Sequence, residues 1–240
     1  MTAPPPPDPR QPLAGTTCVV TGASRGIGRA IARRFAAAGA RVGLLARSAD
    51  ALADLAAELG GPPRAAWAPC DVADSAQVTA AAAHVRAALG PVDVVVNNAG
   101  AVVRAPAFSV DDATWRRVLA VNLDGTFFVS RAFADDLVAR AGRIINIASI
   151  AGRQGTPLLA AYCAAKHGVV GLTRALAEEL RGGRVAVNAI CPGSVDTDML
   201  REGLPGATPD MTADDIAATA LFLAADAPQA LTGSCIDVFG

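Results

Sequence analysis

Short, almost uninterrupted runs of apolar residues alternate along the chain with longer stretches in which apolar residues recur every three or four positions. Runs of the first kind predict buried β-strands, and recurrences of the second kind, such as Ile27, Ile31 and Phe35, predict amphipathic helices. The sequence predicts strands at 17–21, 41–46, 65–69, 92–97, 143–148, 184–190 and 235–238. Helices are predicted to begin near Ile27 and to cover 49–59, 74–88, 111–140, 160–181 and 213–225.

The predicted strands are apolar on both faces rather than on one. The run from Val92 to Val96 is interrupted only by Asp93, which is typical of a parallel strand covered by helices on both sides. Strands that alternate with helices are joined by right-handed crossovers. The sequence therefore predicts an α/β fold, a Rossmann-type doubly wound three-layer sandwich with a seven-stranded parallel sheet. Ligands of such sheets bind at the carboxyl ends of the strands.

Length and composition limit the organisation of the chain. Its 240 residues are 52% hydrophobic and 18% charged, which excludes a disordered chain and suits a single domain from 16 to 240. Residues 1–15 begin with a proline-rich stretch and are expected to form an extended, disordered tail without the apolar core of a secretion signal. No apolar run is long enough to span a membrane, and a net charge of −1 argues against nucleic acid as a partner.

The five cysteines carry no recognisable pattern. They lie at positions 18, 70, 163, 191 and 235, without a C-x-x-C pair or metal-ligand spacing. We therefore expect reduced thiols in a cytoplasmic protein, and no metal site.

A glycine-rich loop follows the first predicted strand. The strand leads directly into Thr21-Gly-Ala-Ser-Arg-Gly-Ile-Gly28 and then into a helix. Glycines at such a turn let the backbone approach a phosphate, and the free N–H groups at the helix start attract its negative charge. The loop therefore predicts a dinucleotide site that includes Gly22, Ser24, Arg25, Gly26, Ile27 and Gly28.

The end of the second predicted strand bears on the choice of dinucleotide. NAD sites usually place a carboxylate there for the ribose hydroxyls, whereas this strand ends Leu44-Leu-Ala-Arg47-Ser48. Arg47, together with Arg25, can grip a 2′-phosphate through charge-assisted hydrogen bonds. The sequence favours NADP(H) over NAD(H), and two solvated arginines are the alternative reading.

The only tyrosine and the only lysine of the chain lie four residues apart. Of the 21 basic residues 20 are arginine, and the exception is Lys166, one helical turn after Tyr162. A tyrosine ordinarily ionises near pH 10, so it is a poor acid or base at neutral pH. A neighbouring ammonium stabilises the phenolate, and we expect Lys166 to lower the pKa of Tyr162 toward the range that acid–base catalysis needs.

At this point the residues resemble a known family, the short-chain dehydrogenases/reductases, and in particular its single-domain members that resemble 3-oxoacyl-carrier-protein reductases. The likeness covers residues 16–240 and rests on motifs at fixed places. These are T-G-x-x-x-G-x-G at Thr21–Gly28, N-N-A-G at Asn97–Gly100, Asn122 in V-N-L, Ser149 in I-A-S-I-A-G, Y-x-x-x-K at Tyr162–Lys166, and Pro192-Gly193 before Thr197. Arg25 and Arg47 also match members that prefer NADP(H).

The resemblance implies a ketone–alcohol oxidoreductase, most simply an NADPH-driven ketoreductase. In such enzymes Tyr162 is the proton donor, Ser149 binds the carbonyl oxygen, Lys166 binds the ribose and Asn122 holds a water of the proton relay. The resemblance also implies cofactor contacts at Asp71, Val72, Asn98, Ala99, Gly100, Pro192, Gly193 and Thr197. Plainer readings are a strand-end turn for Ser149, a helix-bend hydrogen bond for Asn122, a helix cap for Asp71 and a loop turn for Thr197.

Two other functions stay open: an alcohol, polyol or steroid dehydrogenase that works oxidatively, and a non-catalytic NADP(H) sensor. The segment between Thr197 and Asp214 is short and broken by glycine and proline, so we expect an exposed pocket that accepts a small or carrier-bound carbonyl compound. Its apolar walls are expected from Val102, Ile150, Leu158, Leu159 and Met199. The C-terminal Val238-Phe-Gly240 departs from the V-D-G-G of the family, which leaves a homodimer or a homotetramer open.

Overall fold

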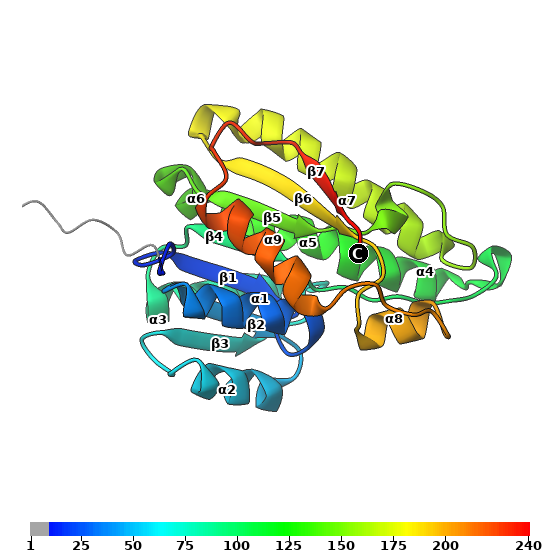
Figure 1. Cartoon of the computed structure of the whole chain (residues 1–240), viewed down its shortest axis with the longest axis horizontal. Helices are drawn as coiled ribbons and strands as arrows, with labels where there is room; N and C mark the ends of the chain where they lie inside the picture. The colour runs from blue at the N-terminus through cyan, green and yellow to red at the C-terminus, as the bar shows by residue number, and fades with distance from the viewer. Residues whose placement is uncertain (1–9) are drawn as a thin grey trace, which may run out of the picture.

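The computed structural model describes residues 10–240, which form a seven-stranded parallel sheet between two layers of helices (Figure 1). The strands lie in the order β3-β2-β1-β4-β5-β6-β7. Their bounds are β1 Thr17–Thr21, β2 Arg41–Ala46, β3 Ala65–Pro69, β4 Val94–Asn97, β5 Arg143–Ile147, β6 Ala186–Pro192 and β7 Cys235–Val238. The order reverses between β1 and β4, and in doubly wound sheets the ligand crevice lies at that point. The predicted fold class is therefore confirmed.

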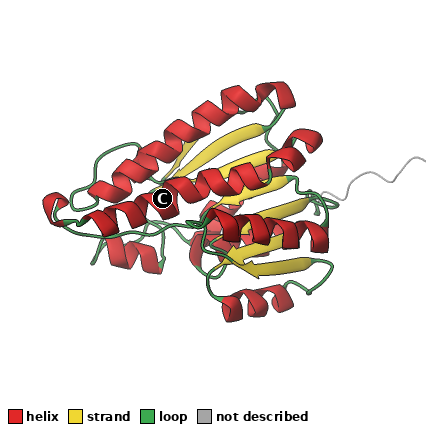
Figure 2. Cartoon of the chain, turned by 180° about the vertical axis from the view of Figure 1, so that it is seen from behind, coloured by secondary structure: helices red, strands yellow, loops and turns green. Residues whose placement is uncertain are grey.

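Helices cover both faces of the sheet (Figures 1 and 2). One apolar core lies under α1 (Gly26–Ala37), α2 (Ala49–Glu58) and α9 (Ala213–Ala225). The other lies under α3 (Ser75–Leu89), α5 (Gly125–Ala132), α6 (Ala134–Arg140) and α7 (Ala160–Glu179). Between residues 10 and 240 no helix combines the length and the apolar composition needed to cross a membrane.

Two helical regions differ from the prediction. The single helix predicted over 111–140 is instead α4 (Asp112–Leu119), a π-helical turn (Ala120–Asp124), α5 and α6. A further helix, α8 (Asp198–Gly203), lies where the glycines and prolines predicted none. With six residues α8 is too short for an apolar period to show in the sequence, and Thr197 caps its first turn by accepting a hydrogen bond from the Leu200 N–H.

The packed part of the chain begins before residue 16. Leu13 is buried, and its N–H donates to the Ala38 carbonyl at 2.9 Å. Gly39 lies so close that a Cβ there would come within 3.2 Å of Ala14. The tail boundary predicted at residue 15 was therefore placed too late, because a single leucine among prolines gives no periodic pattern. The rest of the predicted tail, residues 1–9, lies outside the described residues.

Candidate active site

A cleft of about 840 Å³ opens at the carboxyl ends of the central strands. We call its base the floor: the glycine loop 21–28, the end of β4 at 97–100, the end of β5 at 147–149, and the first turns of α7. We call residues 197–204, which include α8, the wall. The cleft is lined by all the cofactor contacts and catalytic residues predicted from the sequence except Gly28 and Asn122. These residues are Gly22, Ser24, Arg25, Gly26, Ile27, Arg47, Asp71, Val72, Asn98, Ala99, Gly100, Ser149, Tyr162, Lys166, Pro192, Gly193 and Thr197.

Asn98 fastens the glycine loop to the end of β4. Its Nδ2 donates to the Thr21 carbonyl at 2.9 Å, while the Thr21 hydroxyl accepts from the N–H groups of Asn98 and Ala99. Gly22 has a φ of +63°, and a Cβ there would lie 2.9 Å from the Ala99 Cα. Only glycine fits a position that combines a left-handed backbone with such a close neighbour.

Gly28 lies behind the loop rather than in the cleft. A Cβ there would come within 2.4 Å of both the Asn98 Nδ2 and the Gly22 carbonyl oxygen, so this glycine lets α1 start directly beneath the loop. The N-terminus of α1 has no side-chain cap and no acidic residue in its first turn. Its N–H groups and positive helix dipole are therefore available to an anion in the cleft, and the floor fits the pyrophosphate of a dinucleotide.

The arginines predicted to bind a 2′-phosphate differ in their partners. The Arg25 guanidinium pairs with Asp198 of the wall at 3.2 Å, whereas Arg47 is exposed and has no salt bridge to any residue between 10 and 240. Burial opposes ionisation of Asp71, but hydrogen bonds from Arg117 at 2.8 Å and from the Ala73 N–H outweigh it and lower the pKa of the carboxyl. The positive charge of Arg47 acts in the same direction.

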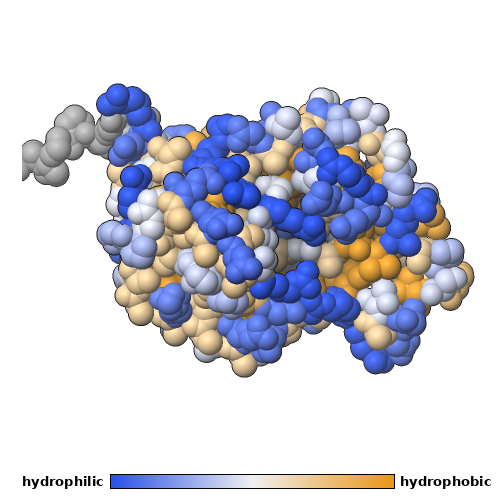
Figure 3. Space-filling model, turned by 90° about the horizontal axis from the view of Figure 1, so that it is seen from below, coloured by the Kyte–Doolittle hydropathy of each residue, from blue (hydrophilic) through white to orange (hydrophobic). Residues whose placement is uncertain are grey.

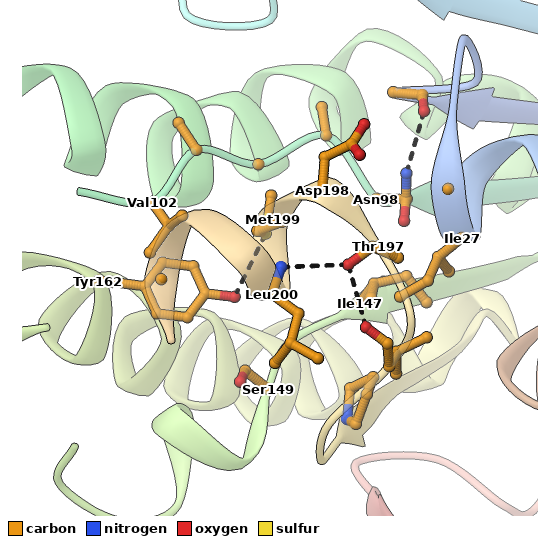
Figure 4. A pocket seen from close by; sticks show the side chains of 18 of the residues that line it. Ile27, Asn98, Val102, Ile147, Ser149, Tyr162, Thr197, Asp198, Met199 and Leu200 are labelled. Atoms are coloured by element: carbon orange, nitrogen blue, oxygen red, sulfur yellow. Dashed lines mark hydrogen bonds between the residues drawn. The ribbon is translucent and has the colours of Figure 1, made fainter. Parts of the chain in front are cut away.

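Tyr162 and Lys166 lie on the same side of α7 and face the end of β5. The Lys166 Nζ donates to the Ile147 carbonyl at 2.7 Å and lies 5.6 Å from the centre of the Tyr162 ring. The Tyr162 hydroxyl points toward the wall, 3.9 Å from the Met199 Sδ (Figure 4). Ser149 follows the end of β5 and lines the same cleft. Its Oγ accepts a hydrogen bond from the Ala151 N–H at 3.1 Å.

Burial controls the protonation of both groups. It raises the pKa of Tyr162 to about 12, against the lowering influence of the Ser149 hydroxyl, and it lowers the pKa of Lys166 to about 8. We expected Lys166 to bring the pKa of Tyr162 down toward neutrality. The structure differs, because removal of the phenol from water is the largest effect on its pKa. Tyr162 is thus held as a protonated phenol.

Asn122 lies in the π-helical turn rather than in the cleft lining. Its Nδ2 donates to the carbonyls of Ala101 and Val118, at 2.8 and 2.9 Å, which is the helix-bend role that the sequence left open. Its Oδ1 is buried and has no hydrogen-bond partner among the described residues. A buried acceptor without a partner is unusual, and this one lies beside Gly100 at the edge of the floor, where it offers a place for a polar group such as a water.

Comparison with known proteins agrees with this geometry. The family described as short chain dehydrogenase matches residues 16–206. The chain belongs to this family. As a short-chain dehydrogenase/reductase it is an oxidoreductase that acts on CH–OH and C=O groups with a nicotinamide cofactor.

Three similar proteins place this short-chain dehydrogenase among enzymes with different substrates. A galactitol 2-dehydrogenase (L-tagatose-forming) of Cereibacter sphaeroides is 45% identical, with 95% of each chain covered. A 3-oxoacyl-[acyl-carrier-protein] reductase of Chlamydia trachomatis is 36% identical over 95% of this chain and 97% of its own. The crystal structure of a putative NAD(P) dependent gluconate 5-dehydrogenase from Beutenbergia cavernae, with bound NADP at low occupancy, superposes with a TM-score of 0.85. That chain is 42% identical, with 94% of this chain and 95% of the other covered.

A buried polar network supports α7 of this short-chain dehydrogenase, and sequence reasoning missed it. The Asn97 Nδ2 donates to the Ser130 hydroxyl and the Asn146 Oδ1, both at 2.9 Å, and the Asn146 Nδ2 donates to the Thr173 hydroxyl at 2.9 Å. The network ties β4, β5, α5 and α7 together behind Tyr162 and Lys166. An asparagine inside the apolar run Arg143-Ile-Ile-Asn-Ile147 is the feature of the sequence that could have indicated it.

The apolar walls predicted for the pocket are present with one exception. Val102, Ile150, Leu159 and Met199 line the cleft, but Leu158 does not. Leu158 has a left-handed backbone with a φ of +68° just before α7, and its carbonyl accepts from the Ala105 N–H. That turn directs Leu159, rather than Leu158, into the cleft.

Proposed function

We propose that the protein is an NADP(H)-dependent oxidoreductase that interconverts a ketone and a secondary alcohol, with Tyr162 as the general acid and base. One observation carries the proposal. The only tyrosine of the chain is buried at the cleft floor as a protonated phenol, next to Ser149 and Lys166. A phenol that keeps its proton at neutral pH is suited to donate it to an oxygen that becomes negatively charged.

The residues divide the reaction among them. When bound, the reduced nicotinamide supplies a hydride to the carbonyl carbon. Tyr162 gives its proton to the carbonyl oxygen, so that the ketone becomes the alcohol, and Ser149 holds that oxygen by a hydrogen bond. Lys166 stabilises the phenolate that remains, and the free Oδ1 of Asn122 holds a water through which the proton returns from solvent. The residues that would hold the cofactor are Gly22, Gly26, Asn98, Gly100, Pro192, Gly193 and Thr197, and Asp71 and Val72 would bind its adenine end.

The preference for NADP(H) rests on charge. Arg47 follows β2, whose end carries no carboxylate that would repel a 2′-phosphate, and Arg25 lies in the glycine loop. The bound NADP of the gluconate 5-dehydrogenase structure is consistent with this choice. Steady-state kinetics with both cofactors tests it. We expect NADPH to be preferred, and we expect Arg25→Ala and Arg47→Ala each to weaken the binding of NADPH but not of NADH. A preference for NADH that neither substitution changes would refute the proposal.

Replacement of the phenol tests the role of Tyr162. Tyr162→Phe keeps the ring and removes the proton donor, so turnover should fall by a factor of about 100 to 10,000 while cofactor binding and folding are retained. Turnover at the wild-type rate in this variant would contradict the mechanism, and unchanged binding of NADPH in the same preparation shows that the site is intact.

The direction of the reaction is the second part of the proposal. A protonated Tyr162 favours reduction, for a small-molecule or carrier-bound ketone. The galactitol dehydrogenase among the relatives favours the oxidative direction as the alternative. Rates in both directions with matched ketone and alcohol pairs decide between them, and absence of turnover with bound NADP(H) would favour a sensor. We further propose that the protein is cytoplasmic and forms a homodimer or a homotetramer. Light scattering of the purified protein distinguishes the two oligomeric states by their mass.

A further inference from the structure

The part of the cleft beside the reactive hydroxyl is apolar. The large apolar residues of the cleft lining include Val102, Ile150, Leu159, Met199, Leu200 and Leu204. Val102 and Met199 pack against the small core that contains Leu159 and Tyr162, and Figure 4 shows both next to the tyrosine ring and hydroxyl. On the face seen in Figure 3, hydrophobic residues border a hollow of the surface. A substrate that places its carbonyl at Tyr162 therefore places its neighbouring carbon atoms against hydrocarbon and a thioether.

The charged side chains that line the cleft have other partners. Asp71 is bound by Arg117, Asp198 by both Arg25 and Arg201, and Asp210 accepts from the Ser194 hydroxyl. The Lys166 Nζ donates to the Ile147 carbonyl. Arg25 and Arg47 belong to the cofactor contacts. Within residues 10–240, no cation lining the cleft is thus left for a carboxylate of the substrate.

Uncharged polar groups are also few on this side. Apart from Ser149 and Tyr162, which the reacting oxygen uses, the segment before α7 offers Gln154 and Thr156, and Gln154 is exposed at the rim. A sugar alcohol buries several hydroxyls, and each needs a hydrogen-bond partner or loses the free energy of its contact with water. An apolar chain has no such need and gains free energy from the same surface.

We infer that the substrate carries uncharged, apolar groups next to its reacting carbon, as in an alkyl or aryl ketone or the matching secondary alcohol. The inference rests on the proposed reaction and adds the substrate class, which differs from the sugar alcohol and the gluconate named for two relatives. Leu204 is 38% exposed at the open end of the wall, so a longer apolar chain can leave the cleft along it.

Three acyclic secondary alcohols with six carbons test the class: 2-hexanol, 5-hydroxyhexanoate and galactitol. The first two differ only in a terminal methyl or carboxylate, and galactitol carries a hydroxyl on every carbon. We expect kcat/KM with NADP⁺ to be highest for 2-hexanol, by about tenfold or more over each of the others. A kcat/KM for galactitol or 5-hydroxyhexanoate equal to or above that of 2-hexanol would overturn the inference.

Substitutions in the pocket sharpen the test. Val102→Thr adds a hydroxyl at constant shape, and Met199→Gln replaces the thioether by an amide of similar length; both should shrink the advantage of 2-hexanol severalfold. Val103→Thr is the matched control, because Val103 is the next residue, is 38% exposed and does not line the cleft. If Val103→Thr changes the ratio of kcat/KM values as much as Val102→Thr does, the apolar lining of the cleft is not what selects the substrate.

Binding separates this inference from the proposed function. Ligand-observed NMR with NADP⁺ present ranks the same three alcohols whether or not they react. Tighter binding of 2-hexanol without turnover supports the substrate class and counts against the proposed reaction. Turnover in which galactitol is the best of the three alcohols supports the proposed reaction and contradicts the inferred substrate class.

Discussion

The floor and the wall of the cleft are held by different forces. In the floor, Asn98 and Thr21 form hydrogen bonds that are partly or fully buried, and Gly28 leaves no room for a side chain. The wall is tied by exposed ion pairs from Arg25 to Asp198 and from Arg201 to Asp196 and Asp198, with side chains 56–65% exposed. A buried polar group that loses its partner costs about 1–3 kcal/mol, whereas an exposed ion pair contributes about 0–1 kcal/mol. Changes in the floor should therefore lower the stability of the fold and the affinity for the cofactor by more than changes in the wall do.

Gly28→Ala should have the largest effect. Its Cβ would meet the Gly22 carbonyl at 2.4 Å, where backbone must move, and we expect the free energy of unfolding to fall by about 3 kcal/mol and NADPH binding to be lost. Gly203→Ala is the matched change in the wall, where the Cβ would lie 3.2 Å from a methyl of Val102 that can shift. Chemical denaturation and cofactor titration compare them, and equal losses would mean that floor and wall do not differ in rigidity.

The pH dependence of stability tests the burial of Lys166. Its pKa is about 8 in the fold and near 10.5 in an unfolded chain, so between these values only the unfolded chain holds the proton. Rising pH then favours the folded state. From pH 8 to 10.5 the unfolding free energy of the wild type should rise by about 3 kcal/mol relative to Lys166→Met. The burial-raised pKa of Tyr162 acts in the opposite sense above pH 10, but it is common to both proteins.

Parallel stability curves for the wild type and Lys166→Met would show that Lys166 keeps its ordinary pKa. The measurement needs no substrate, because chemical denaturation at each pH gives the difference directly.

Asn98→Ala should have an intermediate effect. The substitution removes the donor to the Thr21 carbonyl without adding bulk, so we expect about 2 kcal/mol less stability and a roughly tenfold weaker affinity for NADPH. Thr197→Ala removes the cap of α8 in the wall and should cost about 1 kcal/mol or less. Loss of cofactor affinity in Thr197→Ala but not in Asn98→Ala would reverse the roles given to the two regions.

The sequence indicated the floor better than the wall for a physical reason. Strand periods and a glycine loop are local, so β1, β2, β3 and β7 were predicted to the residue, and Tyr162 and Lys166 stood out by composition. Contacts between distant segments leave no local pattern. The pairing of Arg25 with Asp198 joins residues 173 positions apart. The burial that raises the pKa of Tyr162, contrary to the expectation, also depends on how distant segments pack around α7.

Local sequence also failed where a helix is irregular. The stretch 111–140 shows one helical period, yet the π-helical turn at Ala120–Asp124 interrupts it and directs Asn122 against the carbonyls of Ala101 and Val118. The position of Asn122 depends on that extra residue in the turn, which an apolar period does not register. An apolar period also does not register α8, a helix of six residues that begins directly after the capping residue Thr197.

Asp198→Asn should have the smallest effect on stability and still be informative. It weakens an exposed pair, so the free energy of unfolding should change by less than about 1 kcal/mol. In the wild type, Asp198 competes with the 2′-phosphate for the Arg25 guanidinium. Because the substitution removes this competition, NADPH should bind roughly threefold more tightly, while the affinity for NADH stays the same. Titration of both cofactors measures the two affinities.

Asp112→Asn is the matched control, because it breaks a pair with Arg116 that is still more exposed and lies on α4, away from the cleft lining. It should leave both cofactor affinities unchanged. If Asp198→Asn instead lowers the affinity for NADPH, the pair between Arg25 and Asp198 persists when the cofactor is bound and holds the wall against the floor. The two regions would then act as one clamp, and the wall would contribute to affinity as well as to selectivity.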